Sequence, residues 1–230
     1  MPHVFVADVA APVLDDEDRH HLERVLRTRV GEEVTVADGR GGWRRCAFTA
    51  GGGLEPVGEV EQRPAPMPAI TVAFALTKGE KPETAVQKLT ELGVDRIVPF
   101  AAARSVARWD GDRAERHVAR LRKVAREAAM QSRRAQLPIV DDVVDFAAAA
   151  AIPGACLADA GGAPPSLDRP VVLVGPEGGW SDEERAAGLP TVGLGPFVLR
   201  AETAALTAGA LLGALRAGFV DHAGSLPPVR

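Results

Sequence analysis

Residues 171–180 read VVLVGPEGGW, in which four apolar residues run directly into a turn with three glycines and a proline. The apolar part is typical of a strand buried inside a parallel sheet. Glycine and proline directly after such a strand indicate a tight turn where the backbone approaches a ligand closely. This junction predicts an α/β domain with a binding site at the carboxyl end of the strand.

A second glycine-rich stretch lies downstream, where residues 192–203 read VGLGPFVLRAET. Because both turns follow strands, we expect them to line one pocket. Their backbone N–H and C=O groups would hydrogen-bond an adenine edge without a charged side chain. The segment from Gly193 to Val198 lacks the third glycine of a dinucleotide fingerprint and has Pro196 where a helix should begin. A Rossmann cofactor site is therefore not expected there.

Strands and helices alternate around these loops. The apolar patterns predict strands at 70–76, 97–100, 155–158 and 171–174, and helices at 81–92, at 113–134, from Ser181 and at about 203–218. Ser181 with Glu184 forms a capping box at the start of its helix. The alternation predicts a mostly parallel sheet covered on both faces.

The N-terminal part has a different pattern. Three prolines between Pro64 and Pro68 mark a hinge that cannot continue a helix. Before the hinge, the pattern predicts a helix at 15–27 and a hairpin whose strands include Val34–Val36 and Trp43–Phe48. The sequence thus predicts two domains, a small β-rich one over 1–66 and an α/β one over 69–230.

Composition and charge narrow the function. The chain is 46% hydrophobic and 25% charged, which is typical of a globular protein. The formal net charge is −4, yet residues 104–134 hold ten Lys/Arg against four acids. A basic segment in an acidic chain indicates either a local polyanion contact or simply a solvated helix face.

Several classes of protein and site are not expected. No apolar run approaches the roughly 20 residues that span a membrane, and no basic region precedes an apolar core at the N-terminus. The two cysteines, Cys46 and Cys156, lack the spacing of a metal site. We expect a cytoplasmic protein with reduced thiols, no metal and no membrane contact.

Three stretches around the two loops carry a resemblance. Residues 173–179 (LVGPEGG), 194–196 (LGP) and 198–204 (VLRAETA) resemble the SPOUT methyltransferases. More narrowly, they resemble the RsmE family, which methylates N3 of a uridine in 16S ribosomal RNA. Residues 20–27, 87–94 and 126–138 agree with this family, so the resemblance covers nearly the whole chain in order.

The resemblance implies a fold and partners. The C-terminal domain would be a SPOUT domain with a deep trefoil knot at about 171–218, preceded by a PUA-like β-barrel domain that helps to grip RNA. S-adenosyl-L-methionine would lie bent in the knot. The implied cofactor contacts are Leu173, Gly175, Pro176, Glu177, Gly178, Gly179, Leu194, Gly195, Pro196, Val198, Leu199 and Thr203. The family works as a homodimer whose substrate site forms partly across the interface.

Two positions depart from many relatives. Phe197 stands where arginine is frequent, and Ala201 stands where threonine is common. Neither change affects the glycines, so cofactor binding is still expected. Phe197 is not expected to make the RNA contact that an arginine would make at this position.

The reaction itself suggests catalytic residues. Uracil N3–H is weakly acidic, and the charge left by its deprotonation spreads onto two carbonyl oxygens. A guanidinium would stabilise that charge, for which we select Arg200. Glu202 and Glu177 are candidate proton acceptors. The structural alternatives are a helix-start ion pair for Arg200, compensation of the helix dipole for Glu202 and bonding to loop amides for Glu177.

The partner would be 16S rRNA within the small ribosomal subunit. Basic and polar side chains would contact its phosphates and bases. The candidates are His21, Arg24, Arg27, Arg104, Arg126, Gln131, Arg133 and Arg134. Two other functions stay open at this point, namely a SPOUT ribose 2′-O-methyltransferase and a non-catalytic RNA-binding factor in ribosome assembly.

Overall fold

A computed structural model describes residues 1–220, in which the chain divides into two compact units. Unit 1 comprises residues 1–65 and 126–137, and unit 2 comprises residues 66–125 and the chain from 138 onward. The division at 65/66 falls beside the proline-rich hinge. The sequence placed 126–137 in the C-terminal domain, whereas here it groups with the N-terminal residues. Residues 221–230 of the predicted domain lie outside the described part.

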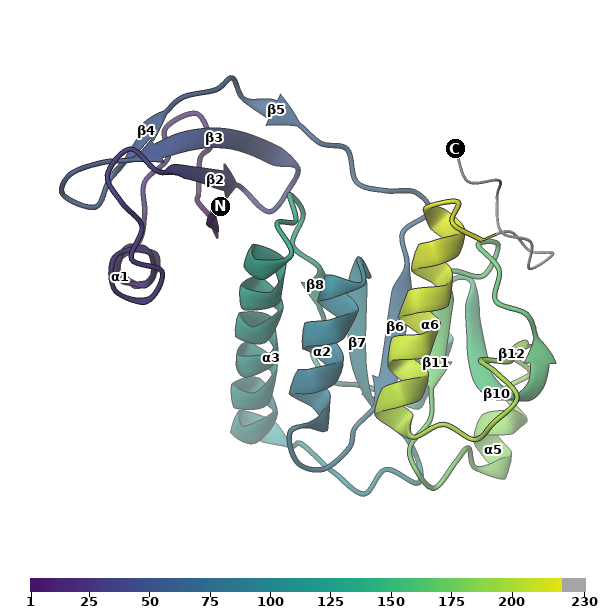
Figure 1. The fold of residues 1–230 in the computed structure, drawn as a ribbon. Coiled ribbons are helices and arrows are strands. Elements are labelled where there is room, and N and C mark those ends of the chain that lie inside the picture. Colours follow the sequence, from purple (N-terminus) through teal and green to yellow (C-terminus); the bar gives the residue numbers. More distant parts are fainter. Residues whose placement is uncertain (221–230) are drawn as a thin grey trace. The chain divides into compact units, whose positions relative to one another are not determined.

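Unit 1 is built on a five-stranded sheet (Figure 1). Its strands are β1 (His3–Phe5), β2 (Glu33–Ala37), β3 (Gly42–Phe48), β4 (Leu54–Pro56) and β5 (Glu61–Gln62). The predicted hairpin is confirmed, because β2 and β3 pair antiparallel with Val34 opposite Cys46. β1 joins β2 in parallel, and both β4 and β5 pair with β3.

The helix predicted at 15–27 is shorter and divided. It consists of α1 (Asp16–His20) followed by a π-helical turn, η1 (His21–Val25). Asp15 caps α1 by accepting a hydrogen bond from the backbone N–H of Asp18 at 2.7 Å. Arg27 then adopts a φ of 52°, which ends the helical path.

The later segment of unit 1 is part of its core. Ala129 and Ala135 are buried with Phe5, Ala37 and Trp43 in one apolar cluster. Arg126 reaches Asp18, whose side chain is 3% exposed, with a Nη2–Oδ2 distance of 2.5 Å. A buried carboxylate requires a charged or hydrogen-bonding partner, and the guanidinium of Arg126 supplies one to Asp18.

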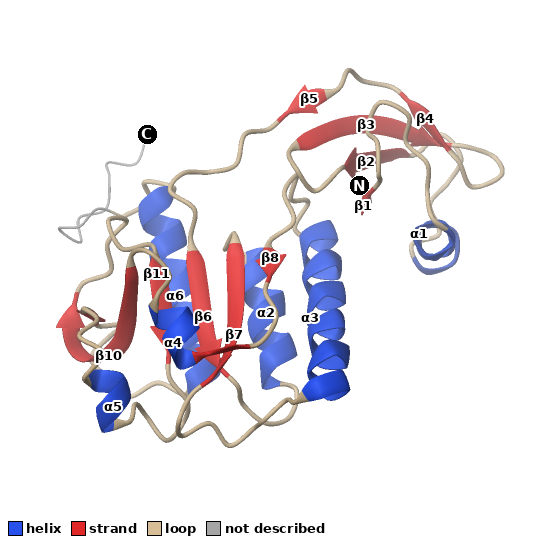
Figure 2. Cartoon of the chain, turned by 180° about the vertical axis from the view of Figure 1, so that it is seen from behind, coloured by secondary structure: helices blue, strands red, loops and turns tan. Residues whose placement is uncertain are grey.

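Unit 2 holds a parallel sheet, as predicted, and this sheet has seven strands (Figure 2). Its strands are β6 (Thr71–Ala75), β7 (Arg96–Ala101), β8 (Ile139–Val140), β9 (Val144–Asp145), β10 (Ala155–Ala163), β11 (Val171–Val174) and β12 (Thr191–Val192). The order is β12-β10-β11-β6-β7-β8, with β9 also on β7. The short strands β8, β9 and β12 were not predicted, because two residues carry no periodicity.

Both faces of this sheet are covered, as expected. The helices α2 (Lys81–Glu91), α3 (Gly111–Gln131) and α6 (Ala201–Arg216) lie on one face, over Val72 and Phe74 (Figure 1). The short α4 (Phe146–Ala150) and Trp180 pack on the other, against Ala73 and Ala75. The three long helices begin and end within three residues of their predicted limits. None of the helices within residues 1–220 combines the length and apolar character needed to cross a membrane.

Candidate active site

The carboxyl ends of four parallel strands lead into the segments that hold the candidate residues. β11 runs into loop 175–180, and β12 runs into loop 193–200. β6 leads to the start of α2, and β7 leads to Arg104. Because all four strands are parallel, these segments meet at one edge of the sheet, where open α/β sheets bind their ligands.

Loop 175–180 is held firmly at its end. Trp180 donates a hydrogen bond from Nε1 to the carbonyl of Ala158 at 2.9 Å and stacks on Phe100 with ring centroids 6.2 Å apart. Gly179 has a φ of 69°, a conformation that favours glycine. The predicted capping box then starts α5 (Asp182–Arg185), as Ser181 and Glu184 bond each other's backbone N–H groups.

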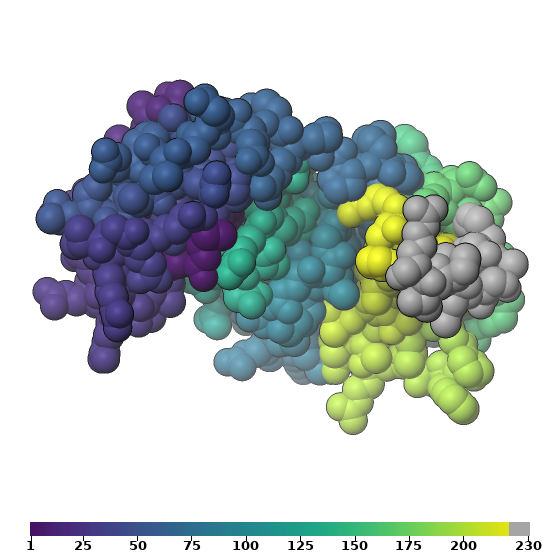
Figure 3. Space-filling model, turned by 45° about the horizontal axis from the view of Figure 1, so that its top comes forward, coloured from purple at the N-terminus to yellow at the C-terminus, as the bar shows by residue number. Residues whose placement is uncertain are grey.

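Loop 193–200 is anchored only at its start. Gly193 donates its backbone N–H to Ala163 at 2.9 Å, and Leu194 packs on the core. Beyond it, the side chains of Phe197 and Val198 are 82% and 98% exposed. The yellow-green residues before α6 reach the surface in Figure 3. Within residues 1–220, the backbone N–H groups of Gly195, Phe197, Val198 and Leu199 donate to no protein acceptor, which leaves them available to a ligand.

Three charged side chains meet where these loops approach α2. Lys81 donates a hydrogen bond from Nζ to Oε1 of Glu177 at 2.7 Å, and its Nζ lies 3.6 Å from Oε2 of Glu202. The hydrogen bond from Lys81 holds the pKa of Glu177 below its usual range, and the same bond raises the pKa of Lys81. Sequence reasoning selected both glutamates but missed Lys81, whose only signal is its position at the first turn after β6.

The two glutamates differ in how their oxygens are satisfied. Oε2 of Glu202 is buried and has no hydrogen-bond partner, since the 3.6 Å ion pair with Lys81 is too long for one. A buried acceptor left unpaired costs about 1–3 kcal/mol. A ligand that offered a donor here would recover that energy.

Arg200 is the N-cap residue of α6 and is exposed. Its guanidinium makes no ion pair within residues 1–220, so the helix-start ion pair considered from the sequence gains no support. Glu202 does lie in the first turn of α6, where a carboxylate also compensates the helix dipole. Arg104 borders the same edge, with Nη1 donating to the carbonyl of Gly178 at 3.2 Å.

The other candidate RNA-binding residues belong to unit 1. Arg24, Arg27, Gln131 and Arg133 are exposed, and His21 is half-buried. The remaining two also make contacts inside the unit. Arg126 is paired with Asp18, and the backbone carbonyl of Arg134 accepts a hydrogen bond from His3 at 3.0 Å.

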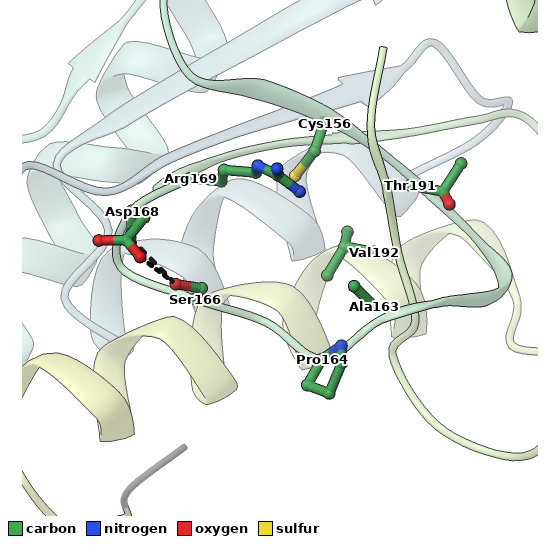
Figure 4. Close-up of a pocket in the computed structure, with 8 residues that line it drawn as sticks. All are labelled: Cys156, Ala163, Pro164, Ser166, Asp168, Arg169, Thr191 and Val192. Atoms are coloured by element: carbon green, nitrogen blue, oxygen red, sulfur yellow. Dashed lines mark hydrogen bonds between the residues drawn. The ribbon is translucent and has the colours of Figure 1, made fainter.

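A separate cavity of about 210 Å³ lies beside β10 and β12 (Figure 4). Cys156, Ser166, Asp168 and Thr191 are among its lining residues, and Ser166 Oγ donates to Asp168 at 3.3 Å. None of the candidate site residues lines it. In the part of the chain that the structure describes, no three His, Cys, Asp or Glu side chains are grouped to hold a metal ion.

The chain matches two protein families. Residues 63–213 match an RNA methyltransferase domain, and residues 14–56 match an RNA methyltransferase PUA domain. Among curated proteins, the ribosomal RNA small subunit methyltransferase E of Mycobacterium bovis is 37% identical, over 90% of this chain and 87% of its own. Its Bacillus subtilis counterpart is 31% identical, over 84% of this chain and 85% of its own.

Solved structures agree over both units. A ribosomal RNA small subunit methyltransferase E from Neisseria gonorrhoeae, bound to S-adenosyl methionine, has a TM-score of 0.77 at 29% identity. The match covers 94% of this chain and 98% of that one. A Legionella pneumophila structure in complex with the same cofactor has a TM-score of 0.80 at 26% identity and covers 93% and 97%.

Proposed function

The chain belongs to the ribosomal RNA small subunit methyltransferase E family, and from this premise we propose that it transfers a methyl group from S-adenosyl-L-methionine to N3 of a uridine in 16S rRNA. One observation carries the chemical part of the proposal. At the carboxyl edge of a parallel sheet, the start of α6 holds Arg200, which makes no ion pair within residues 1–220, and Glu202, whose buried Oε2 has no hydrogen-bond partner there.

The cofactor would lie between loops 175–180 and 193–200. The unpaired backbone N–H groups of the second loop suit the acceptor atoms of an adenine edge. Loop 175–180, fixed by Trp180, would form the opposite wall. The residues that the family resemblance assigns to cofactor contacts all belong to these two loops, except Leu173 in β11 and Thr203 in α6.

The chain's residues would supply positioning and charge. When bound, the cofactor carries a methyl group that its sulfonium already activates, so the difficult part is to deprotonate and orient the uracil. Arg200 would hold a carbonyl oxygen of the base and stabilise the negative charge that develops on it. A carboxylate beside it would take the proton from N3.

The RNA would be gripped by unit 1 as well as by Arg104. The only non-glycine residues with positive φ within residues 1–220 are Arg27 and Arg133, both candidate RNA contacts. Such strained backbone clusters at functional sites, which supports a role for these two exposed arginines. Arg24, Gln131 and His21 would add contacts to the RNA. Arg126 and Arg134 would add contacts through the atoms that are not bonded to Asp18 and His3.

The finer structural expectations are part of the same proposal. The family resemblance implies a knot at about 171–218, and this range runs from β11 through β12 into α6. The sheet of unit 1 and its PUA match support a PUA-like barrel. A homodimer in the cytoplasm, acting on the small ribosomal subunit, completes the proposal. The exposed Phe197 offers apolar surface for a second copy.

Methyl transfer tests the proposal directly. The purified chain is incubated with isotope-labelled S-adenosylmethionine and small ribosomal subunits that lack the modification, and the RNA is digested for nucleoside mass spectrometry. We expect label in 3-methyluridine. Label in a 2′-O-methyl nucleoside would mean that the enzyme methylates a ribose hydroxyl and not uracil N3, with the proposed fold unchanged. Absence of both label and cofactor binding would leave an RNA-binding assembly factor.

A further inference from the structure

Lys81 is the charged residue of the site that no sequence motif selected. It begins α2, directly after the turn that follows β6, and its side chain is 37% exposed. Its ammonium group lies between Glu177 of one loop and Glu202 of α6. One side chain thus connects three segments that are far apart in the sequence.

The two contacts of Lys81 are unequal. The contact with Glu177 is a hydrogen bond of 2.7 Å, which fixes that carboxylate as the partner of a cation. The contact with Glu202 is 3.6 Å long, close enough for attraction and too long for a hydrogen bond. Glu202 is also the less exposed of the two, at 21% against 39% for Glu177.

We propose that Lys81 is a positioning residue that gives Glu177 and Glu202 different roles. It binds Glu177 as a fixed ion pair and attracts Oε2 of Glu202 without a hydrogen bond to it, so that this oxygen accepts the proton of uracil N3. This assignment rests on the proposed function, since it names the proton acceptor of that reaction.

The edge of uracil requires both kinds of group. Its N3–H donor stands beside a carbonyl acceptor, and the start of α6 carries a donor, Arg200, and an acceptor, Glu202. The N3 proton passes to Oε2, and the nitrogen lone pair forms a bond to the methyl carbon. The carbon–sulfur bond breaks toward sulfur, which leaves neutral S-adenosylhomocysteine and a protonated Glu202. Glu177 is less suited to this step, because its hydrogen bond with Lys81 lowers its pKa and makes it a weaker base.

Four substitutions in the full-length protein test the roles assigned to Lys81, Glu177 and Glu202. They are Glu202→Gln, Glu177→Gln, Lys81→Met and Lys81→Arg, each assayed for kcat, for KM with undermodified small subunits and for S-adenosylmethionine binding by calorimetry. Lys88→Met is the matched control, because Lys88 lies on the same helix and pairs with Glu91 of that helix at 2.8 Å, away from the two glutamates of the site.

We expect Glu202→Gln to lower kcat by about 100-fold or more, the effect typical of a lost general base, with cofactor affinity preserved. Glu177→Gln should lower kcat by roughly 10-fold or less. Lys81→Met should reduce kcat more than it raises KM, Lys81→Arg should restore most of the loss, and Lys88→Met should behave as wild type.

Three results would overturn the assignment. The first is a greater loss of kcat in Glu177→Gln than in Glu202→Gln. The second is an unchanged kcat in Lys81→Met. The third is a loss of cofactor affinity in Glu202→Gln, which would mean that Oε2 meets the cofactor and not the base. Failure of the proposed function is distinct from all three, because the wild-type protein would then place no label in 3-methyluridine.

Discussion

Arg200 is the residue on which the proposed chemistry most depends. It is exposed, it starts a helix, and within residues 1–220 its guanidinium has no charged partner to lose. Its removal should therefore affect the reaction while leaving the fold intact. A residue with a structural ion pair would affect both.

We predict that Arg200→Ala lowers kcat by about 10²–10³-fold, as the loss of one oxyanion-stabilising donor does in other enzymes. The dissociation constant for S-adenosylmethionine and the melting temperature should remain close to those of wild type. Arg200→Lys should recover only part of the rate, because a point charge replaces a planar fork of donors. An unchanged kcat in Arg200→Ala would refute the role.

The cysteines should be chemically silent. Burial raises the pKa of the Cys156 thiol to about 11 and also raises the pKa of Cys46. Since the thiolate is the reactive form, neither residue should react with iodoacetamide at neutral pH in the native protein, whereas both should react in denaturant. Intact-mass spectrometry of the two samples checks this. Rapid alkylation of the native protein would contradict the burial.

At the scale of elements, β12 depends on one glycine of β10. A Cβ on Gly162 would lie 2.5 Å from the carbonyl carbon of Val192 and 2.6 Å from its nitrogen. These are backbone atoms, so the strand itself would have to move. The strand that would be displaced leads directly into loop 193–200.

Gly162→Ala should therefore cost about 1–3 kcal/mol of unfolding free energy, as overpacking does, and should weaken S-adenosylmethionine binding. Denaturant unfolding and calorimetry measure the two effects. Gly58→Ala is a control with ordinary contacts of 3.5 Å or more, for which we expect a change of about 0.5 kcal/mol or less. Equal effects in both variants would show that the close approach has no consequence.

Elements with strong periodicity could be predicted from the sequence. The helix of residues 81–91 and the strand of residues 171–174 follow from apolar spacing and turn residues alone. The π-helical turn at 21–25 and the two-residue strands could not be predicted, because their backbone is decided by contacts with distant residues. The site followed the same rule. The glycine-rich loops could be recognised in the sequence. The role of Lys81 could not, because it depends on partners 96 and 121 residues away in the chain.

At the scale of the whole molecule, stability should depend on a buried histidine. His3 bonds Thr35 Oγ1 at 2.8 Å and the carbonyl of Arg134 at 3.0 Å. Burial lowers its pKa from 6.5 to about 4. Between these values the unfolded chain binds a proton that the folded chain does not, so stability falls as pH falls.

The free energy of unfolding should decrease by about 1.5 kcal/mol between pH ~6.5 and pH ~5 through His3 alone. His3→Gln removes the titration, so its stability should depend less on pH over this range. Denaturant titrations of both proteins at several pH values provide the comparison. Parallel curves would mean that His3 does not titrate as its burial implies.

The domain division is the part of the architecture that the sequence could not reveal. The prolines indicated a boundary near residue 66, but nothing local marks 126–137 as part of unit 1. That membership depends on Ala129 and Ala135 in its core and on Arg126 paired with Asp18. These residues contact partners that lie more than eighty positions away in the chain.

A fragment of residues 1–66 should accordingly fail to unfold cooperatively. It would leave Asp18 as a buried carboxylate without its guanidinium, a loss of about 3–5 kcal/mol. The same fragment joined to residues 126–137 by a flexible linker should regain a cooperative transition, measured by circular dichroism during heating. Cooperative unfolding of residues 1–66 alone would contradict the division.

The divided composition of unit 1 also sets an order of events during synthesis. The ribosome delivers residues 1–65 early, yet the segment that completes their core is translated only after more than half of the chain has been made. The nascent N-terminal part therefore lacks part of its core while the first strands and helices of unit 2 are being synthesised. In this protein, unit 1 can complete its core only after residue 137 has been made, at a point where unit 2 still lacks β10, β11 and α6.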